Sequence, residues 1–169
     1  MSARARESLG AQFGAALDML ERALGACPES AWGGPGDWHA FWYLASHTLW
    51  WTDYYLAGDA AGFRPPAPFG MEEADPDGAL PPRVFTPGEL QAYLAHVRAR
   101  LDVVFSELSE ERAAAPCGYP RKDFSVHELH LYNLRHVQHH VGQLQLLLRQ
   151  AGVTPPRWVA RGAVPGTGA

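Results

Sequence analysis

The spacing of apolar residues along the chain predicts long amphipathic helices. From about Arg4 to Leu24, apolar residues return at alternating steps of four and three positions, which places them on one narrow helix face. After Thr86 they repeat at heptad a and d spacing, the pattern of a helix that packs in a left-handed bundle. The positions of this second pattern are Leu90, Leu94, Val97, Leu101, Val104 and Leu108.

Two more helices are predicted, one before and one after this heptad segment. The segment from about Trp38 to Leu56 is unusually aromatic, and Asp37 is the residue expected to cap it. The segment from Val126 to about Ala151 is rich in leucine and carries a cluster of histidines. Capping boxes precede the heptad helix and the last helix, with Glu89 and Glu128 as their acidic members.

Two stretches have no regular period. Residues 58–85 are dominated by Gly, Pro and Ala, and a connection of this length is usually a crossover, a lid or a binding loop. Its aromatic residues are too many for a free linker, so we expect it to pack over one end of the bundle. Residues 153–169 are rich in Pro and Gly, and no structure is assigned to them beyond an irregular or disordered tail.

These elements predict one all-α domain over residues 1–169. Four amphipathic helices with one long connection after the second are typical of a four-helix bundle with a crossover loop. A chain of 169 residues can bury one substantial core but is short for two domains.

Composition excludes several classes of function. The net charge is −4 and there is no run of Lys or Arg, so a nucleic-acid surface is not expected. The sequence has neither a signal peptide pattern nor an apolar run of about 18 residues, so we expect a cytoplasmic protein that does not span a membrane. Cys27 and Cys117 are expected to be reduced thiols without a catalytic role.

The candidate chemistry lies in the last helix, in the sequence R-H-V-Q-H-H-V-G-Q-L. His136 and His140 are four residues apart and therefore lie one above the other at the edge of the apolar face. His139 is rotated by about 100° from His140, toward solvent. The pair at i and i+4 is thus the inward chelate, and histidine is the commonest metal-ligating side chain.

A third ligand is expected from the aromatic helix. His47 shares a face with Tyr43 and Tyr54, and Trp51 lies close beside it, so His47 points inward at the middle of its helix. Three neutral imidazoles leave a divalent ion an open position, as in catalytic zinc centres. The helix faces carry no evident carboxylate, which disfavours the iron site of two histidines and one carboxylate.

The same residues also have a purely structural interpretation. A pair of histidines four apart on a helix is often coincidental, and a single core histidine such as His47 is usually a hydrogen-bonded packing residue. Helix geometry alone leaves these two interpretations open.

The two histidine segments resemble the DinB-like superfamily. The family pattern is a histidine in the second helix and H-x-x-H-H-x-G-Q late in the chain, matched here by A-S-H-T-L-W-W-T-D-Y-Y-L and L-R-H-V-Q-H-H-V-G-Q-L. The resemblance covers about residues 5–152. It implies an up-down-down-up four-helix bundle, a divalent metal, usually nickel or zinc, on His47, His136 and His140, and in many members a homodimer.

The resemblance also implies a range of reactions. Some relatives are transferases or isomerases that use low-molecular-weight thiols such as mycothiol or bacillithiol, and many have no known reaction. We therefore expect a metal-dependent enzyme that transfers such a thiol to a small-molecule electrophile. A metal-dependent hydrolase and a non-enzymatic metal or small-molecule binding stress protein are the alternatives.

No catalytic residue can be named from the sequence. Residues that share faces with the proposed ligands are candidates for the substrate pocket or for contacts to the ligands: Tyr43, Trp51, Tyr54, Asn133 and Gln143. Gln143 belongs to the family motif, but Gly142 and Gln143 could equally serve helix packing, and the two tyrosines could simply line a pocket.

Overall fold

Four long helices form the body of the protein in this computed structural model, which describes residues 1–166. These helices are α1 (Ala3–Ala26), α3 (Phe41–Ala57), α4 (Pro87–Glu107) and α6 (Val126–Gln150). Two short helices, α2 (Glu29–Trp32) and α5 (Glu110–Ala114), and one 3₁₀ turn, η1 (Glu72–Ala74), lie in the connections. The prediction of an all-helical protein is confirmed for the described residues, in which no strand is found.

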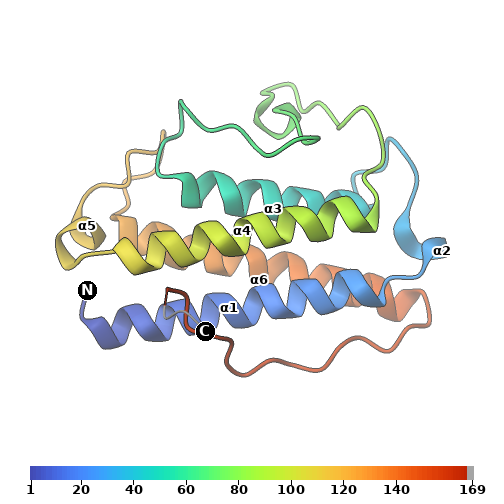
Figure 1. Cartoon of the computed structure of the whole chain (residues 1–169). Coiled ribbons are helices and arrows are strands. Elements are labelled where there is room, and N and C mark those ends of the chain that lie inside the picture. The colour runs from blue at the N-terminus through green and yellow to red at the C-terminus, as the bar shows by residue number, and fades with distance from the viewer. Residues whose placement is uncertain (167–169) are drawn as a thin grey trace.

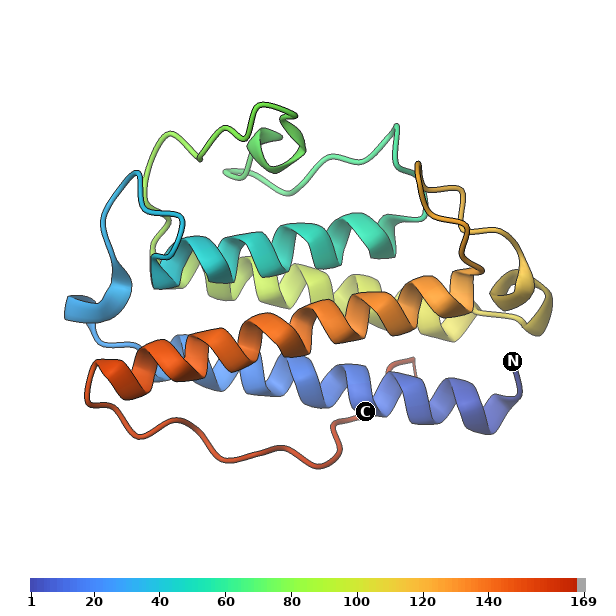
Figure 2. The ribbon, with the colours of Figure 1, turned by 180° about the vertical axis from the view of Figure 1, so that it is seen from behind.

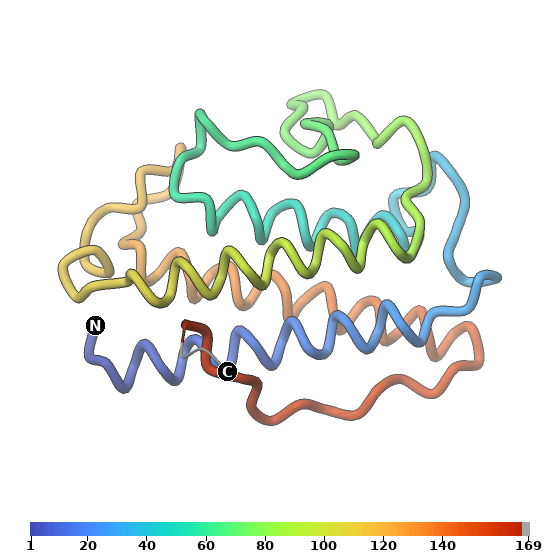
Figure 3. The backbone as a smooth tube through the Cα atoms, viewed as in Figure 1, coloured from blue at the N-terminus to red at the C-terminus, as the bar shows by residue number. Residues whose placement is uncertain are grey.

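The long helices lie side by side, and each contacts two of the others (Figure 1). α3 packs against α4 and α6, and α1 packs against the same two helices from the other side. α3 and α4 run in the same direction, opposite to α1 and α6, so the connection between α3 and α4 returns along the length of the molecule (Figures 1 and 3). α3 and α6, the helices that carry the histidine segments, are therefore direct neighbours.

Local signals explain where the helices begin. Thr86 and Glu89 form a complete capping box at the start of α4, and the Ser125 hydroxyl accepts a hydrogen bond from the Glu128 N–H at the start of α6. The predicted start of the aromatic helix is wrong by three residues. Asp37 accepts from the His39 N–H inside a preceding turn, and α3 begins only at Phe41.

The buried faces are those that the apolar spacing predicted. Leu9, Phe13, Ala16, Leu20 and Ala23 of α1 are all buried, as are Leu90, Leu94, Val97 and Leu101 of α4. α3 differs because its apolar residues surround the helix, and both Trp42 and Trp50 are almost fully buried. A helix that is apolar all round needs cover on every side.

The connection over residues 58–86 supplies that cover, and it lies along α3 rather than over one end of the bundle (Figure 1). The Trp50 indole N–H donates to the Gly70 carbonyl at 2.9 Å, and Phe63 packs edge-on against Trp50. Phe69 and Phe85 are buried together over α4. The expected position of this loop was wrong because its aromatic residues fill the side of α3.

The tail has no helix or strand in residues 153–166, and it is docked on the bundle. Residues 153–166 run back along α1 (Figure 2). The Gly162 N–H donates to the Ala11 carbonyl at 3.0 Å, the Gln12 side chain donates to the Ala160 carbonyl, and Arg161 pairs with Glu7. Part of the tail prediction, residues 167–169, lies outside the described residues.

A buried polar cluster joins α3 to α4. Asp53 has no exposed surface and lies 3.0 Å from an Arg100 guanidinium nitrogen, 3.3 Å from the Tyr93 hydroxyl and 3.5 Å from His96 Nε2. Burial raises the pKa of Asp53, although the Arg100 and His96 side chains act in the opposite direction.

Two further expectations concern thiols and membranes. Cys27 and Cys117 are both free. Burial raises the pKa of the Cys27 thiol to about 11, which keeps it protonated at neutral pH. No helix in residues 1–166 is long and apolar enough to cross a membrane.

Candidate metal centre

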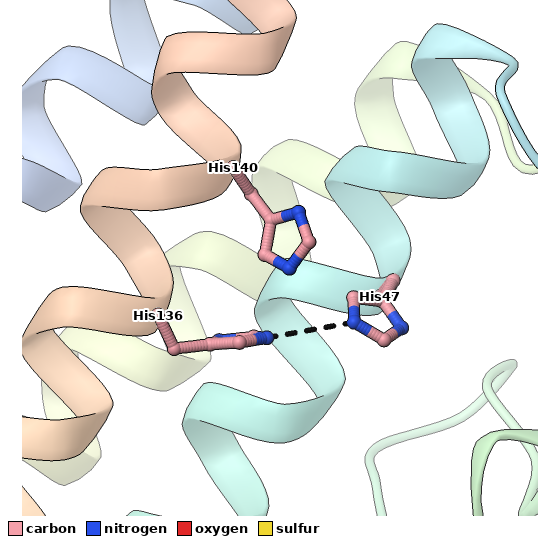
Figure 4. A group of neighbouring side chains, drawn as sticks. All are labelled: His47, His136 and His140. Atoms are coloured by element: carbon pink, nitrogen blue, oxygen red, sulfur yellow. Dashed lines mark hydrogen bonds between the residues drawn. The ribbon is translucent and has the colours of Figure 1, made fainter.

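Three histidine side chains meet in the space between α3 and α6 (Figure 4). His47 comes from the middle of α3, and His136 and His140 come from consecutive turns of α6. The ring centroid of His47 lies 5.4 Å from that of His136 and 4.8 Å from that of His140. The centroids of the two α6 rings are 4.5 Å apart. One nitrogen from each residue lies within 4.8 Å of the other two.

The spacing of these nitrogens fits a metal ion. His136 Nε2 and His47 Nε2 are 3.5 Å apart. Two nitrogens that each lie about 2.0–2.1 Å from a tetrahedral zinc ion are separated by about 3.4 Å. Small side-chain movements would bring the third nitrogen, from His140, to the same distance from the other two. The cluster is therefore compatible with metal binding.

The outer nitrogens of two of the histidines are held by oxygen acceptors. His47 Nδ1 lies 2.7 Å from Glu73 Oε2, and His140 Nδ1 lies 2.6 Å from Gln143 Oε1. A carboxylate oxygen and an amide oxygen both accept, so each ring carries its proton on Nδ1 and leaves the Nε2 lone pair free. This arrangement, in which an acceptor behind the ring sets its tautomer, is the one metal-ligating histidines adopt.

The environment keeps the α6 histidines neutral. Burial, followed by the neighbouring imidazoles, lowers the pKa of His136 to about 3 and that of His140 to about 4. At neutral pH both rings therefore offer a lone pair rather than a positive charge, which is the form that binds a metal.

Comparison with known proteins identifies the family of the chain. A family model described as the DinB superfamily matches residues 12–144, most of the chain and all three histidines. The chain belongs to the DinB superfamily. No match was found among curated proteins.

The remaining histidines of this DinB-superfamily chain stay outside the cluster. His139 is exposed on α6, as its helical position predicted. His130 is buried on α6 but packs against Phe105 of α4, with ring centroids 5.4 Å apart. His96 lies by Asp53 in the α3–α4 contact.

Three of the five candidate pocket residues contact the cluster or its partners. Tyr43 and Trp51 lie on either side of His47, with ring centroids 6.0 and 6.3 Å from it, and Gln143 holds His140. Burial, followed by the charge of Glu73, raises the pKa of Tyr43, so its hydroxyl remains protonated. These three residues therefore lie directly beside the histidines.

The other two candidates lie elsewhere. The Tyr54 ring packs on Trp50, Phe63 and Tyr119, within the aromatic layer under the crossover loop. Asn133 is fully buried and donates to the Thr52 carbonyl at 3.0 Å, so it joins α6 to α3 one turn away from His136.

Sequence reasoning missed Glu73. This residue lies in η1 of the crossover loop, its side chain is only 6% exposed, and its Oε2 atom also accepts from the Trp51 indole N–H at 3.2 Å. The adjacent acidic pair Glu72-Glu73, in a loop dominated by Gly, Pro and Ala, was the available signal. A carboxylate therefore reaches the cluster after all, but it lies behind His47 rather than on a helix face.

Proposed function

We propose that this DinB-superfamily protein binds a divalent cation on His47, His136 and His140 and is a metal-dependent enzyme. The observation that carries the proposal is the orientation of the rings: Nδ1 of His47 and His140 is held by Glu73 and Gln143, so their Nε2 atoms remain available in the space shared with His136. A packing cluster would not require acceptors that fix the tautomer of two separate rings.

The chemistry on which the proposal depends is that of a neutral three-nitrogen ligand set. Such a ligand set would leave a bound nickel or zinc ion its full charge and an open position, and the ion would supply Lewis acidity that lowers the pKa of a thiol or a water molecule. Glu73 holds His47 in place and, by its negative charge, strengthens the donor power of that ring. Tyr43 and Trp51 provide an apolar flank on which the body of a small substrate would lie.

We propose thiol transfer as the reaction. In this reaction the sulfur of a low-molecular-weight thiol such as bacillithiol or mycothiol forms a bond to an electrophilic carbon, a leaving group departs with its electron pair, and the thiol proton passes to solvent. Neither cysteine of the chain belongs to the group of candidate metal ligands, so the thiol would be supplied as a second substrate. Both thiols belong to the reducing cytoplasm, the compartment proposed for the protein.

Metal analysis tests the base of this proposal. Protein purified without an affinity tag is expected to contain about one divalent ion per chain, and the His47→Ala and His140→Ala variants to contain far less. The His139→Ala variant is the matched control because His139 is on the same helix turn but exposed. Equal metal content in all four proteins would refute the proposed site.

Conjugation assays separate the proposed transferase from the alternatives. Physiological thiols and chloro-dinitrobenzene are expected to give a thioether product and chloride only with metal-loaded wild-type protein. Metal binding without turnover of any thiol would favour a binding protein, and turnover of ester substrates alone would favour a metal-dependent hydrolase.

We also propose that the protein is a homodimer, as many relatives are. Leu131 and Leu146 of α6 are exposed apolar side chains that a second copy would cover. Light scattering coupled to size-exclusion chromatography is expected to give twice the 18.5 kDa chain mass.

A further inference from the structure

A cavity lies beside α5, and none of the three clustered histidines lines it. It is formed where α3 and α4 end and α6 begins, and its volume is about 330 Å³. Leu56, Val104, Leu108 and Leu129 contribute apolar walls, and His130 and Arg112 are its most distinctive polar residues. An apolar cavity of about 150 Å³ admits benzene, so this one has room for a single substituted ring.

His130 is the unusual feature of the wall. Its side chain is 3% exposed, and neither Nδ1 nor Nε2 has a hydrogen-bond partner among residues 1–166. A buried polar atom without a partner costs about 1–3 kcal/mol, so two in one ring are expected to serve a purpose. Burial lowers the pKa of His130 to about 4, so at neutral pH the ring offers one donor and one acceptor.

The rim carries an arginine that is available for an anion. Arg112 of α5 is exposed, and its guanidinium forms no ion pair with a carboxylate among residues 1–166. It reaches across the opening to the end of α3, where a Cβ placed on Gly58 would lie 3.8 Å from Nη2. Arg112 and His130 line the same cavity.

From these features we propose that the cavity is a second ligand site, which binds a small monocarboxylic acid with a ring or branched apolar body. The carboxylate pairs with Arg112 at the rim, the apolar body occupies the space between the leucine and valine side chains, and a hydroxyl or carbonyl group pairs with His130. Glu107, exposed at the same rim, disfavours a second negative charge on the ligand.

This site is distinct from the metal centre. His130 and His136 are six residues apart on α6, which corresponds to about 9 Å along the helix and about 120° around it. His130 faces α4 through Phe105, whereas His136 faces α3 through His47. The proposal therefore does not depend on metal binding or on the reaction at the three histidines.

Three probes test the proposal by calorimetric titration of the full-length, metal-free chain, since a bound metal would itself attract carboxylates. 4-Hydroxyphenylacetate has all three recognition elements, phenylacetate lacks the ring hydroxyl group, and 2-phenylethanol lacks both the ring hydroxyl group and the carboxylate. We expect saturable binding of 4-hydroxyphenylacetate at one site per chain, about fivefold to tenfold weaker binding of phenylacetate, and still weaker binding of 2-phenylethanol.

Variants assign the binding to the cavity. Arg112→Gln is expected to weaken the binding of both carboxylates about tenfold and to leave the binding of 2-phenylethanol unchanged. Arg157 is an exposed arginine in the tail, and Arg157→Gln is expected to leave the binding of all three probes unchanged. His130→Leu is expected to abolish the preference for 4-hydroxyphenylacetate over phenylacetate, and His130→Phe serves the same purpose if the leucine variant does not fold. The proposal is overturned if wild-type protein shows no saturable binding of any probe, or if binding survives unchanged in both the Arg112 and the His130 variants.

Discussion

At the scale of single residues, the two nitrogens of each imidazole have different surroundings, and this difference gives the cluster its chemical character. His47 and His140 have an oxygen acceptor behind the ring, whereas His136 Nδ1 is buried without a partner in residues 1–166. The His136 ring therefore has no acceptor behind it, and the orientation of the site depends chiefly on Glu73 and Gln143. The carboxylate of Glu73 is the stronger of these two acceptors because it is charged.

Loss of Glu73 is expected to weaken metal binding without unfolding the protein. In Glu73→Ala the His47 ring loses the acceptor that sets its tautomer, so the dissociation constant for zinc should rise by about 10-fold to 100-fold. Glu72→Ala is the matched control because Glu72 is the neighbouring acid in the same 3₁₀ turn. Competition with a chromophoric chelator measures both constants, and equal values for the two variants would show that Glu73 does not support the site.

The buried His130 predicts a loss of stability in mild acid. Its pKa is about 4 in the folded state and about 6.5 in the unfolded chain, so between these values only the unfolded chain takes up a proton. Its contribution is complete above pH 6.5 and is lost as the pH falls toward 4. Between pH 7 and pH 5 the wild-type protein should lose about 2 kcal/mol of unfolding free energy through this residue alone.

Urea unfolding at the two pH values checks this expectation. His130→Leu should show a correspondingly smaller pH dependence than the wild type. His39→Gln is the control because the His39 side chain is 93% exposed and should not alter it. An unchanged pH dependence in His130→Leu would contradict the expected proton uptake on unfolding.

At the scale of elements, two irregular segments cover helix faces that the long helices do not cover themselves. The crossover loop covers the aromatic side of α3 and brings Glu73 to His47. The tail covers α1 through two close approaches: a Cβ on Gly162 would lie 2.4 Å from the Ala15 nitrogen, and one on Gly14 would lie 2.8 Å from the Ala163 carbonyl oxygen. Both contacts require glycine because backbone meets backbone.

Gly162→Ala is therefore expected to release the tail from α1. The added methyl group would clash with the α1 backbone, which cannot give way as a flexible side chain could. Trypsin cleavage after Arg161 should become several times faster, as measured by mass spectrometry of the released peptide. The bundle itself should stay folded because its core lies between the four long helices.

Gly142→Ala provides the contrast on α6. Nothing lies within 4 Å of a Cβ at this position, so the change should stabilise the helix by about 0.5–1 kcal/mol and leave tail cleavage unchanged. The packing role considered for this glycine is therefore not supported. A similar cleavage rate in Gly162→Ala and Gly142→Ala would show that the tail is not held by the glycine contact.

At the scale of the whole molecule, the three histidines link two helices that are far apart in the sequence. A metal bound by His47 on α3 and by His136 and His140 on α6 would act as a cross-link specific to the folded state. A ligand at 100 times its dissociation constant stabilises the folded protein by about 2.7 kcal/mol. For a chain of this size, that corresponds to a rise in melting temperature of about 5–10 °C.

Zinc and nickel should therefore raise the melting temperature of the metal-free wild-type protein, and a chelator should reverse the rise. The double variant His136→Ala/His140→Ala should show no such rise. A structural bundle with a degenerate site predicts identical melting curves with and without metal, so that result would support the structural interpretation of the histidines.

The helices and their inward faces could be predicted from the sequence because both follow from local physics. Backbone hydrogen bonding within a helix and a period of 3.6 residues determine which side chains share a face. The same rule separated His139 from His136 and His140, since residues four apart stack while adjacent residues diverge. It also identified His47 as inward-facing, and the family resemblance named it as the partner of the α6 pair.

Contacts between distant segments could not be predicted in this way. Glu73 reaches His47 only because a loop without any period folds along α3, and no local rule specifies the path of such a loop. The docking of Gly162 on α1 and the cavity around His130 have the same origin, since each depends on where separate elements come to rest against one another. Periodicity is a property of one segment, whereas the surroundings of a side chain are set by all the segments that pack around it.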